Sequence, residues 1–104
     1  MRNLLIASVS VDEEGRLCVF PNRIDQFYEF IYRAGNGTHW DSARGCFYPN
    51  RQKTSSHLEI FERIYTAAAE ELGMSFVLAS STKWMGLSSK EQTLITEWLN
   101  TRAA

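Results

Sequence analysis

Hydrophobic and polar positions at the start of the chain follow a strand period and then a helical period. The opening segment MRNLLIASVSV alternates from Leu5 onward, which is typical of a half-buried strand. The turn DEEG and a second apolar run, RLCVF, then predict a β-hairpin. Pro21 ends the hairpin, Asn22 is placed to cap a helix and Gly35 to end it. The face expected in the core of the strand comprises Leu5, Ala7, Val9 and Val11, and the helical spacing is carried by Ile24, Phe27, Tyr28 and Ile31.

The same order of elements begins again at Thr38. A short strand through Trp40, the turn DSARG and the strand CFY predict a second hairpin. Ser56 and Glu59 have the spacing of a capping box, and Gly73 is placed to end the helix that they start. The apolar face of this helix is expected to comprise Leu58, Phe61, Tyr65, Ala68 and Leu72.

A third round of strand, strand and helix completes the chain. SFVLA predicts a strand, SST a turn, and KWMGL a shorter strand interrupted by Gly86. Ser88 and Glu91 repeat the capping box. The last helix has one apolar face, formed by Leu94, Ile95, Trp98 and Leu99.

Three such rounds predict a single α+β domain over residues 1–104, with units at about 4–35, 37–73 and 75–104. The word CVFPNR at 18–23 recurs as CFYPNR at 46–51, each time where a hairpin ends and a helix begins. The third unit repeats the order of elements but hardly the words. We expect an antiparallel sheet of five or six short strands with three helices on one face, built from strand-strand-helix (ββα) repeats.

The other face of such a sheet would be solvated, yet the strands offer many large apolar residues to it. An apolar open face indicates dimerisation or a ligand groove. The first helix is aromatic on more than one side through Tyr28, Phe30 and Tyr32, which also favours a partner. The candidates for the open sheet face are Leu4, Ile6, Phe20, Trp40, Phe47 or Tyr48, and Trp84.

Composition narrows the class of protein. A chain of 104 residues that is 44% hydrophobic and 22% charged has enough core to fold alone. The net charge of −1 disfavours nucleic acid as a partner, although residues 16 to 53 carry a local surplus of basic side chains. The opening apolar run is too short for a membrane span and meets three acidic residues, unlike a signal peptide. Cys18 and Cys46 are then expected to be free thiols in the cytoplasm.

Candidate chemistry gathers in the hairpin at 38–51. His39 and Asp41 share a strand face and are placed for an orienting hydrogen bond, although Asp41 also begins a turn and can satisfy backbone amides there. Cys46 with His39 has the residue types of a nucleophile and base, while small buried core positions explain both cysteines more simply. The spacing of cysteines and histidines does not predict a metal site, and nothing indicates a cofactor.

Binding groups complete the candidate set. Arg23 and Arg51 occupy matching places after Pro-Asn, where they could hold a carboxylate or phosphate together with Arg44 and Lys53. The simpler interpretation is solvated arginines. Tryptophans on strands serve cores and clefts alike. The candidate ligand-binding residues are His39, Trp40, Asp41, Arg44, Arg51 and Trp84.

Three segments, VDEEGRLCVFP, GTHWDSARGCFYP and STKWMGL, give the chain a resemblance to small bacterial proteins encoded on mobile integron gene cassettes. The resemblance implies a bacterial cytosolic accessory protein of unknown function. It transfers no catalytic residue to any position of this sequence.

Two hypotheses of function follow. The first is a non-catalytic binding protein that pairs as a homodimer through the open sheet face or the aromatic first helix. The second is a small enzyme, or a protein that binds an anion or small molecule, with a site around the 38–51 hairpin. The second requires His39, Asp41 and an arginine to converge on a cleft between Trp40 and Trp84.

Overall fold

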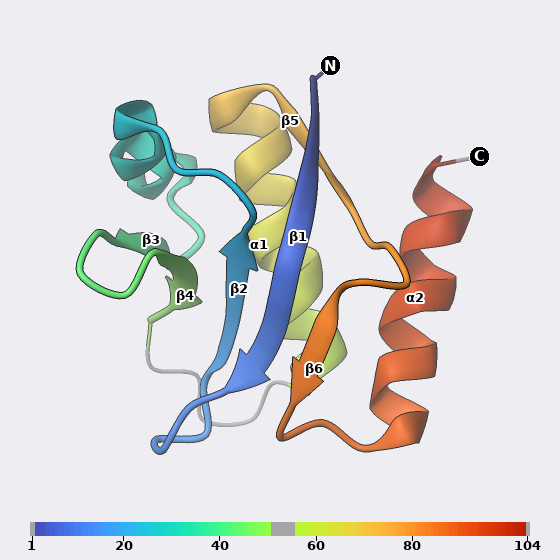
Figure 1. Cartoon of the computed structure of the whole chain (residues 1–104). Helices are drawn as coiled ribbons and strands as arrows, with labels where there is room; N and C mark the ends of the chain where they lie inside the picture. Colours follow the sequence, from blue (N-terminus) through green and yellow to red (C-terminus); the bar gives the residue numbers. More distant parts are fainter. Residues whose placement is uncertain (1, 51–55, 104) are drawn as a thin grey trace.

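The computed structural model describes residues 2–50 and 56–103. Within these ranges the chain forms six strands and three helices, drawn in Figure 1. Their bounds are β1 (Arg2–Val11), β2 (Leu17–Pro21), η1 (Gln26–Ala34), β3 (Thr38–Asp41), β4 (Cys46–Pro49), α1 (His57–Leu72), β5 (Met74–Val77), β6 (Lys83–Met85) and α2 (Ser89–Ala103).

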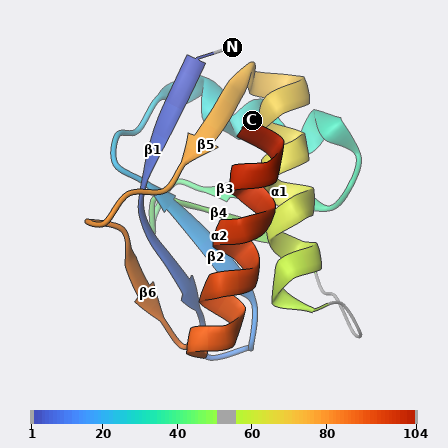
Figure 2. The same ribbon diagram turned by 90° about the vertical axis from the view of Figure 1, so that its right-hand side faces the viewer.

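The strands form one open sheet in the order β3, β4, β2, β1, β5, with β6 paired to β1. The β1–β2, β2–β4 and β3–β4 pairs are antiparallel, whereas β5 and β6 both run parallel to β1. Figure 2 shows η1, α1 and α2 on the same side of this sheet. The predicted α+β class with helices on one face is therefore confirmed, and the expected antiparallel sheet is mostly right but is mixed at the β1 edge.

The expected hairpin of the third unit is wrong. β5 pairs with the first part of β1, from Arg2 to Leu5, and β6 pairs with its second part, from Ser8 to Ser10. Between them Thr82 donates its hydroxyl to the carbonyl of Ile6 at 2.7 Å, inside the protein. The two short strands follow one another along a single edge of β1. β1 is long, so neither short strand alone could hydrogen-bond all the backbone N–H and C=O groups along that edge.

A β-bulge explains why the predicted faces of β1 are wrong at its start. Leu4 and Ile6 are fully buried in the core, while Ala7 is exposed. The register against β2 shifts between Ile6 and Ser8, so that Val9 returns to the core side. An extra residue in one strand reverses the alternation beyond it, and a count of every second residue cannot see this.

The long helix α1 was predicted in detail. The capping box of Ser56 and Glu59 is present, and Gly73 adopts the left-handed conformation that ends the helix. Ser88 and Glu91 form the second capping box through bonds of 3.1 Å in both directions. His57 and Glu91 are hydrogen-bonded to one another, which joins the starts of α1 and α2. Among the described residues, no helix has the length and apolar character needed to cross a membrane.

The first helix differs from its prediction. It is a 3-10 helix whose cap position is Asp25 rather than Asn22, and the cap side chain makes no capping bond. Ile24 lies outside the helix and is 68% exposed. Tyr28 and Ile31 are buried as expected, while Phe30 and Tyr32 are exposed. Gly35 ends the helix in the left-handed conformation, as predicted.

The face of the sheet turned away from the helices is called the uncovered face below. Alternation from buried neighbours places apolar side chains on it. Of the residues expected there, Phe20 and Tyr48 lie on this face, whereas Leu4, Ile6, Trp40, Phe47 and Trp84 belong to the core or pack against it. The apolar residues of the uncovered face are Leu5, Phe20, Tyr48, Val77 and Met85.

Candidate functional site

The candidate residues of β3 divide between the two faces of the sheet. His39 and Asp41 lie on the uncovered face, opposite Tyr48 and Cys46 of β4. Trp40, between them, turns to the helix side and packs against Tyr28 with ring centroids 5.1 Å apart. One strand thus contributes a core aromatic to one face and polar groups to the other, as the period of two requires.

The two tryptophans lie at opposite edges of the sheet. Trp40 is on β3, at one edge, and Trp84 is on β6, paired to β1 near the other. Four strand spacings separate them, which is about 19 Å. They do not line one cleft. Trp84 instead borders a groove along α2 whose other lining residues are Ser89, Gln92, Thr93, Thr96 and Glu97.

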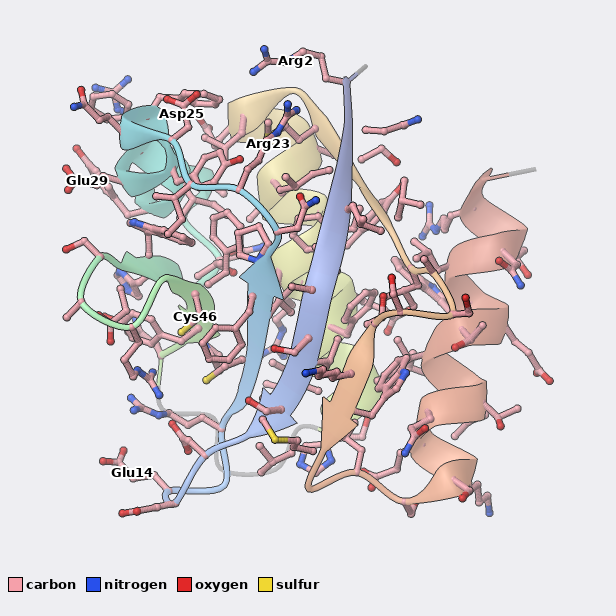
Figure 3. All side chains as sticks on the ribbon, in the orientation of Figure 1. Arg2, Glu14, Arg23, Asp25, Glu29 and Cys46 are labelled. Atoms are coloured by element: carbon pink, nitrogen blue, oxygen red, sulfur yellow. The ribbon has the colours of Figure 1, made fainter. Side chains whose placement is uncertain are left out.

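The candidate arginines are also dispersed. Arg44 follows Asp41 in the β3–β4 turn, whereas Arg23 lies beyond the far end of β2, beside the buried Tyr28. Figure 3 shows Arg23 near Arg2, at the end of the molecule opposite Glu14. Arg51 and Lys53 lie outside the described residues. Burial raises the pKa of the Tyr28 hydroxyl, and the nearby Arg23 opposes that change.

Asp41 closes the β3–β4 turn and holds Arg44. Its Oδ1 accepts hydrogen bonds from the backbone amides of Ala43 at 2.9 Å and Arg44 at 3.0 Å. Its Oδ2 accepts from Nε of Arg44 at 2.9 Å. The pKa of Asp41 is lowered, mainly by the hydrogen bond from the Arg44 side chain and to a smaller extent by the hydrogen bonds from the backbone amides. His39 instead packs against the ring of Tyr48, with centroids 5.6 Å apart.

Asp12 closes the β1–β2 turn in the same way. Its Oδ1 accepts from the backbone amides of Glu14 and Arg16, both at 2.9 Å. Its Oδ2 accepts from Nε of Arg16 at 2.9 Å. Burial alone would raise the pKa of Asp12, but the bonds from Arg16 and Glu14 outweigh it and the pKa is lowered.

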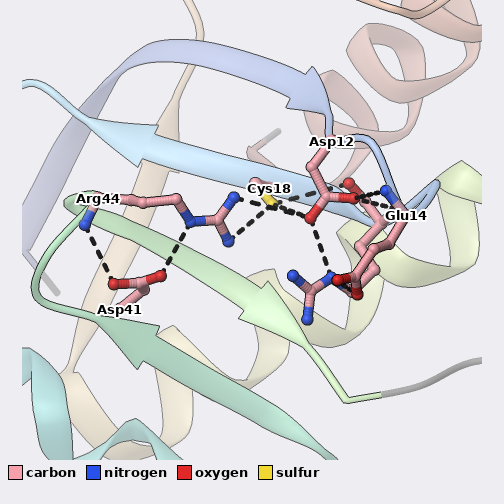
Figure 4. A network of polar contacts seen from close by, with 6 residues as sticks. Asp12, Glu14, Cys18, Asp41 and Arg44 are labelled. Atoms are coloured by element: carbon pink, nitrogen blue, oxygen red, sulfur yellow. Dashed lines mark hydrogen bonds and ion pairs between the residues drawn. The ribbon is translucent and has the colours of Figure 1, made fainter.

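The two turns meet over Cys18. Arg44 reaches from the second turn to the first, with Nη1 at 3.7 Å from Oδ2 of Asp12. Its Nη2 donates to Sγ of Cys18 at 3.7 Å. Figure 4 draws this contact as a dashed line. Arg16 lies over the ring of Tyr48 at 5.4 Å. Together these charged side chains cover Cys18, which is fully buried although it lies on the uncovered face.

Cys46 lies on the same face as Cys18. Val19 pairs with Phe47, so the two cysteines are diagonal neighbours on β2 and β4. A hydrogen bond from the Cys46 thiol and the nearby Arg44 lower the pKa of Cys18, against the opposing effect of burial. The same bond, together with burial, raises the pKa of Cys46. Of the two thiols, Cys18 therefore has the lower pKa.

The arrangement combines two thiols with two arginine-carboxylate turns. Asp12 and Arg16 were not among the predicted site residues, because three consecutive acids on a turn suggest solvated side chains. The sequence nevertheless contains a pattern that could have indicated these residues. Each hairpin has an aspartate, then an arginine, then a cysteine in that order: Asp12, Arg16 and Cys18 in the first, and Asp41, Arg44 and Cys46 in the second.

Comparison with known proteins gives one family and one related structure. The sequence model of the family described as "Integron Cassette Protein Hfx_Cass5" matches residues 4–82. The chain belongs to this family. Its resemblance to integron cassette proteins is thereby confirmed. Two of the segments that carried the resemblance, at 11–21 and 37–49, lie within the match, whereas the third, at 81–87, extends beyond it.

A solved structure of an integron cassette protein, Hfx_Cass5, comes from the mobile metagenome of the North West Arm sewage outfall. It is 22% identical to this integron cassette protein, with a TM-score of 0.46, and the alignment covers 96% of this chain and 98% of the other. The search of curated proteins finds no match.

Proposed function

We propose that this chain is a cytoplasmic, non-catalytic binding protein that self-associates into a homodimer through the uncovered face of its sheet. The observation that carries the proposal is the placement of η1, α1 and α2 on one side of the sheet. The opposite side carries Phe20 and Tyr48, both partly exposed, and Met85, which is 58% exposed. Apolar side chains gathered on one face of a small domain favour a protein interface.

A second copy of the chain is the partner that fits this face best. Twelve acidic and eleven basic side chains leave a net charge of −1, so two copies approach with little repulsion. The charged groups of the face, Arg16 and Arg44 with Asp12 and Asp41, are already paired within one chain. A two-fold contact would therefore meet these charges already paired, and Lys83, which shares the face with Met85 on β6, must stay at its rim.

The polar groups of the hairpin favour binding over catalysis. A general base needs a carboxylate or imidazole free to take a proton. Asp41 is instead held by Arg44 and two backbone amides, and its pKa is lowered by them. Cys18 and Cys46 are free thiols, as expected of a protein in the reducing cytoplasm.

Light scattering coupled to size exclusion tests the proposal. At high micromolar concentration the wild-type chain should run at twice its mass of 11.9 kDa. Met85→Lys places a charge on the uncovered face and should give a monomer. Leu94→Lys is the matched control: Leu94 is 42% exposed on α2, so its variant should remain a dimer.

A third variant separates the two surfaces that could pair. Phe30 is 44% exposed on η1 and belongs to the aromatic first helix rather than to the uncovered face. Phe30→Lys should leave the dimer intact. A wild-type chain that stays monomeric at high micromolar concentration contradicts self-association. A dimer that is lost in Phe30→Lys but kept in Met85→Lys contradicts the choice of face.

A further inference from the structure

Two buried thiols, Cys18 and Cys46, lie side by side on the sheet face that no helix covers. The cluster of packed apolar side chains is on the helix side, while Cys18 and Cys46, which are also among the buried apolar residues of the protein, lie on the other face of the sheet. Both are fully buried, and Cys18 lies beneath the charged side chains of Asp12 and Arg44. Each hairpin also supplies one cysteine at the same place in the words CVFPNR and CFYPNR.

We propose that Cys18 and Cys46 are a reversible redox pair, oxidised by a hydroperoxide to an intramolecular disulfide, with Arg44 as the group that covers and positions Cys18. The pair lies within one chain, so the disulfide needs no second copy, but Arg44 lies on the face proposed for self-association and must stay outside the two-fold contact for peroxide to reach Cys18. Three observations carry it: the diagonal placement of the cysteines on adjacent strands, Nη2 of Arg44 at 3.7 Å from Sγ of Cys18, and the thiol of Cys46 on its other side.

The chemistry balances as two steps. The Cys18 thiolate attacks one oxygen of hydrogen peroxide, an S–O bond forms, the O–O bond breaks, and hydroxide leaves. The thiol of Cys46 then attacks the sulfenic sulfur of Cys18, an S–S bond forms, the S–O bond breaks, and water leaves with the Cys46 proton. Two electrons pass from the thiols to the peroxide. A dithiol reductant reverses the result.

The Arg44 side chain that covers Cys18 can move away from it. Arg44 is held by ion pairs to Asp41 and Asp12, and its side chain is 37% exposed. Such surface pairs are weak, so rotation of the arginine uncovers the sulfur at little cost. While in place, the guanidinium favours the thiolate, which is the reactive form.

The sheet can also bring the two sulfurs together. Diagonal neighbours in an antiparallel pair have Cα atoms about 7–8 Å apart, just beyond the usual range for a disulfide, so the bond requires a movement of the backbone. β4 is a four-residue strand held on its outer side by β3, which is itself at the sheet edge. A small shift of this outer pair toward β2 closes the bond. A metal site is a poorer interpretation, because the described residues contain no group of three or more ligand side chains.

Intact mass and thiol counts test the redox pair. Treatment of the full chain with hydrogen peroxide should remove two hydrogens, a loss of about 2 Da, and both reactive thiols. Dithiothreitol should restore both. Digestion without reduction should yield a peptide that joins Cys18 to Cys46. Covalent dimers on a non-reducing gel, or oxygen adducts on both cysteines of the wild type, would overturn the proposal.

Three variants assign the roles. In Cys46→Ala, Cys18 lacks its partner and should gain oxygen, about 16 Da or more, instead of losing hydrogen. In Cys18→Ala, Cys46 should remain unmodified under the same treatment. Arg44→Gln should slow peroxide oxidation at neutral pH by about threefold to tenfold, because the thiolate loses its cation. Arg33→Gln, which removes a guanidinium that lies over Phe30, is the charge-matched control and should leave the rate unchanged.

Folding is checked for every variant by circular dichroism and thermal unfolding. Should an alanine variant fail to fold, selective alkylation of the folded wild type gives the same assignment. Cys18 should react with iodoacetamide before Cys46, and the reaction should speed up as pH rises. Equal rates for the two thiols would overturn the role of Arg44, and absence of any reaction until the chain unfolds would overturn the redox pair.

Discussion

The β1–β2 and β3–β4 hairpins are closed by the same side-chain arrangement, yet they hold it at different depths. In each turn an aspartate accepts hydrogen bonds from two backbone amides. It also accepts a hydrogen bond of 2.9 Å from Nε of an arginine. The side chain of Asp12 is 13% exposed, whereas that of Asp41 is 28% exposed. The cause is Arg44, which bonds to its own aspartate and then extends over Asp12 of the other hairpin.

The strands that flank the two turns explain this asymmetry. β1 has ten residues and pairs with β2, β5 and β6, while β3 has four and lies at the edge of the sheet. The first turn therefore sits beside the second, which folds over it from the edge. The local sequence determines the hydrogen bonds within each turn. The position of the turn in the sheet determines whether its aspartate also pairs with the other hairpin.

The largest expected difference between the hairpins lies in their matched core residues. Val19 and Phe47 occupy the same place in the repeated words and pair with one another across β2 and β4. Phe47 also contacts the rings of Tyr28, Trp40 and Phe76. Phe47→Ala should lower the free energy of unfolding by about 3–5 kcal/mol, and Val19→Ala by about 2 kcal/mol. Urea denaturation followed by circular dichroism measures both, and equal losses would contradict the greater role of the second hairpin in the core.

A smaller difference is expected between the two turn carboxylates. Asparagine keeps the acceptor for the backbone amides and removes the charge. Asp12→Asn should cost about 1–2 kcal/mol, because two arginines lose their partner, and Asp41→Asn about half as much. Urea denaturation at pH 7 compares them. A larger loss of unfolding free energy in Asp41→Asn would contradict the view that the more buried carboxylate, Asp12, stabilises the fold more.

The same variants predict a pH dependence with a definite sign. The folded-state pKa of each carboxyl lies below its ordinary value of 3.8. The stability from each charge is therefore complete above that value and is lost as pH falls below it. The difference in unfolding free energy between wild type and each asparagine variant should be constant from pH 7 to about 5 and should shrink below about pH 4. If the difference persists at pH 2, the effect of the asparagine comes from its hydrogen-bonding geometry and not from the lost carboxylate charge.

Features set by neighbouring residues were predictable from the sequence, and features set by distant ones were not. Both capping boxes and the first two hairpins are local, since their bonds join residues a few positions apart. The third hairpin was wrong because β5 and β6 pair with β1, some seventy residues away, through contacts such as Thr82 with Ile6. The bulge in β1 likewise appears only once β2 is paired.

The candidate site follows the same rule. Alternation along β3 is enough to put His39 and Asp41 on one face, and the turn is enough to bring Arg44 to Asp41. No local pattern brings Arg44 to Asp12 or Cys18, because that contact requires β4 to pair with β2. Trp40 and Trp84 are separated for a similar reason: their strands are distant in the sheet order, which the sequence does not state.

The smallest expected effect concerns the ion pair that joins the two hairpins. A double-mutant cycle with Asp12→Asn and Arg44→Gln isolates the coupling between Oδ2 of Asp12 and Nη1 of Arg44. Their separation of 3.7 Å and the 37% exposure of Arg44 predict a weak pair, about 0.5 kcal/mol and smaller in high salt. The matched cycle within the first hairpin, Asp12→Asn with Arg16→Gln, should give about 1 kcal/mol, because that pair is hydrogen-bonded at 2.9 Å. If the two couplings are equal, Arg44 belongs to the first turn as fully as Arg16 does, and the two hairpins form one cooperative unit.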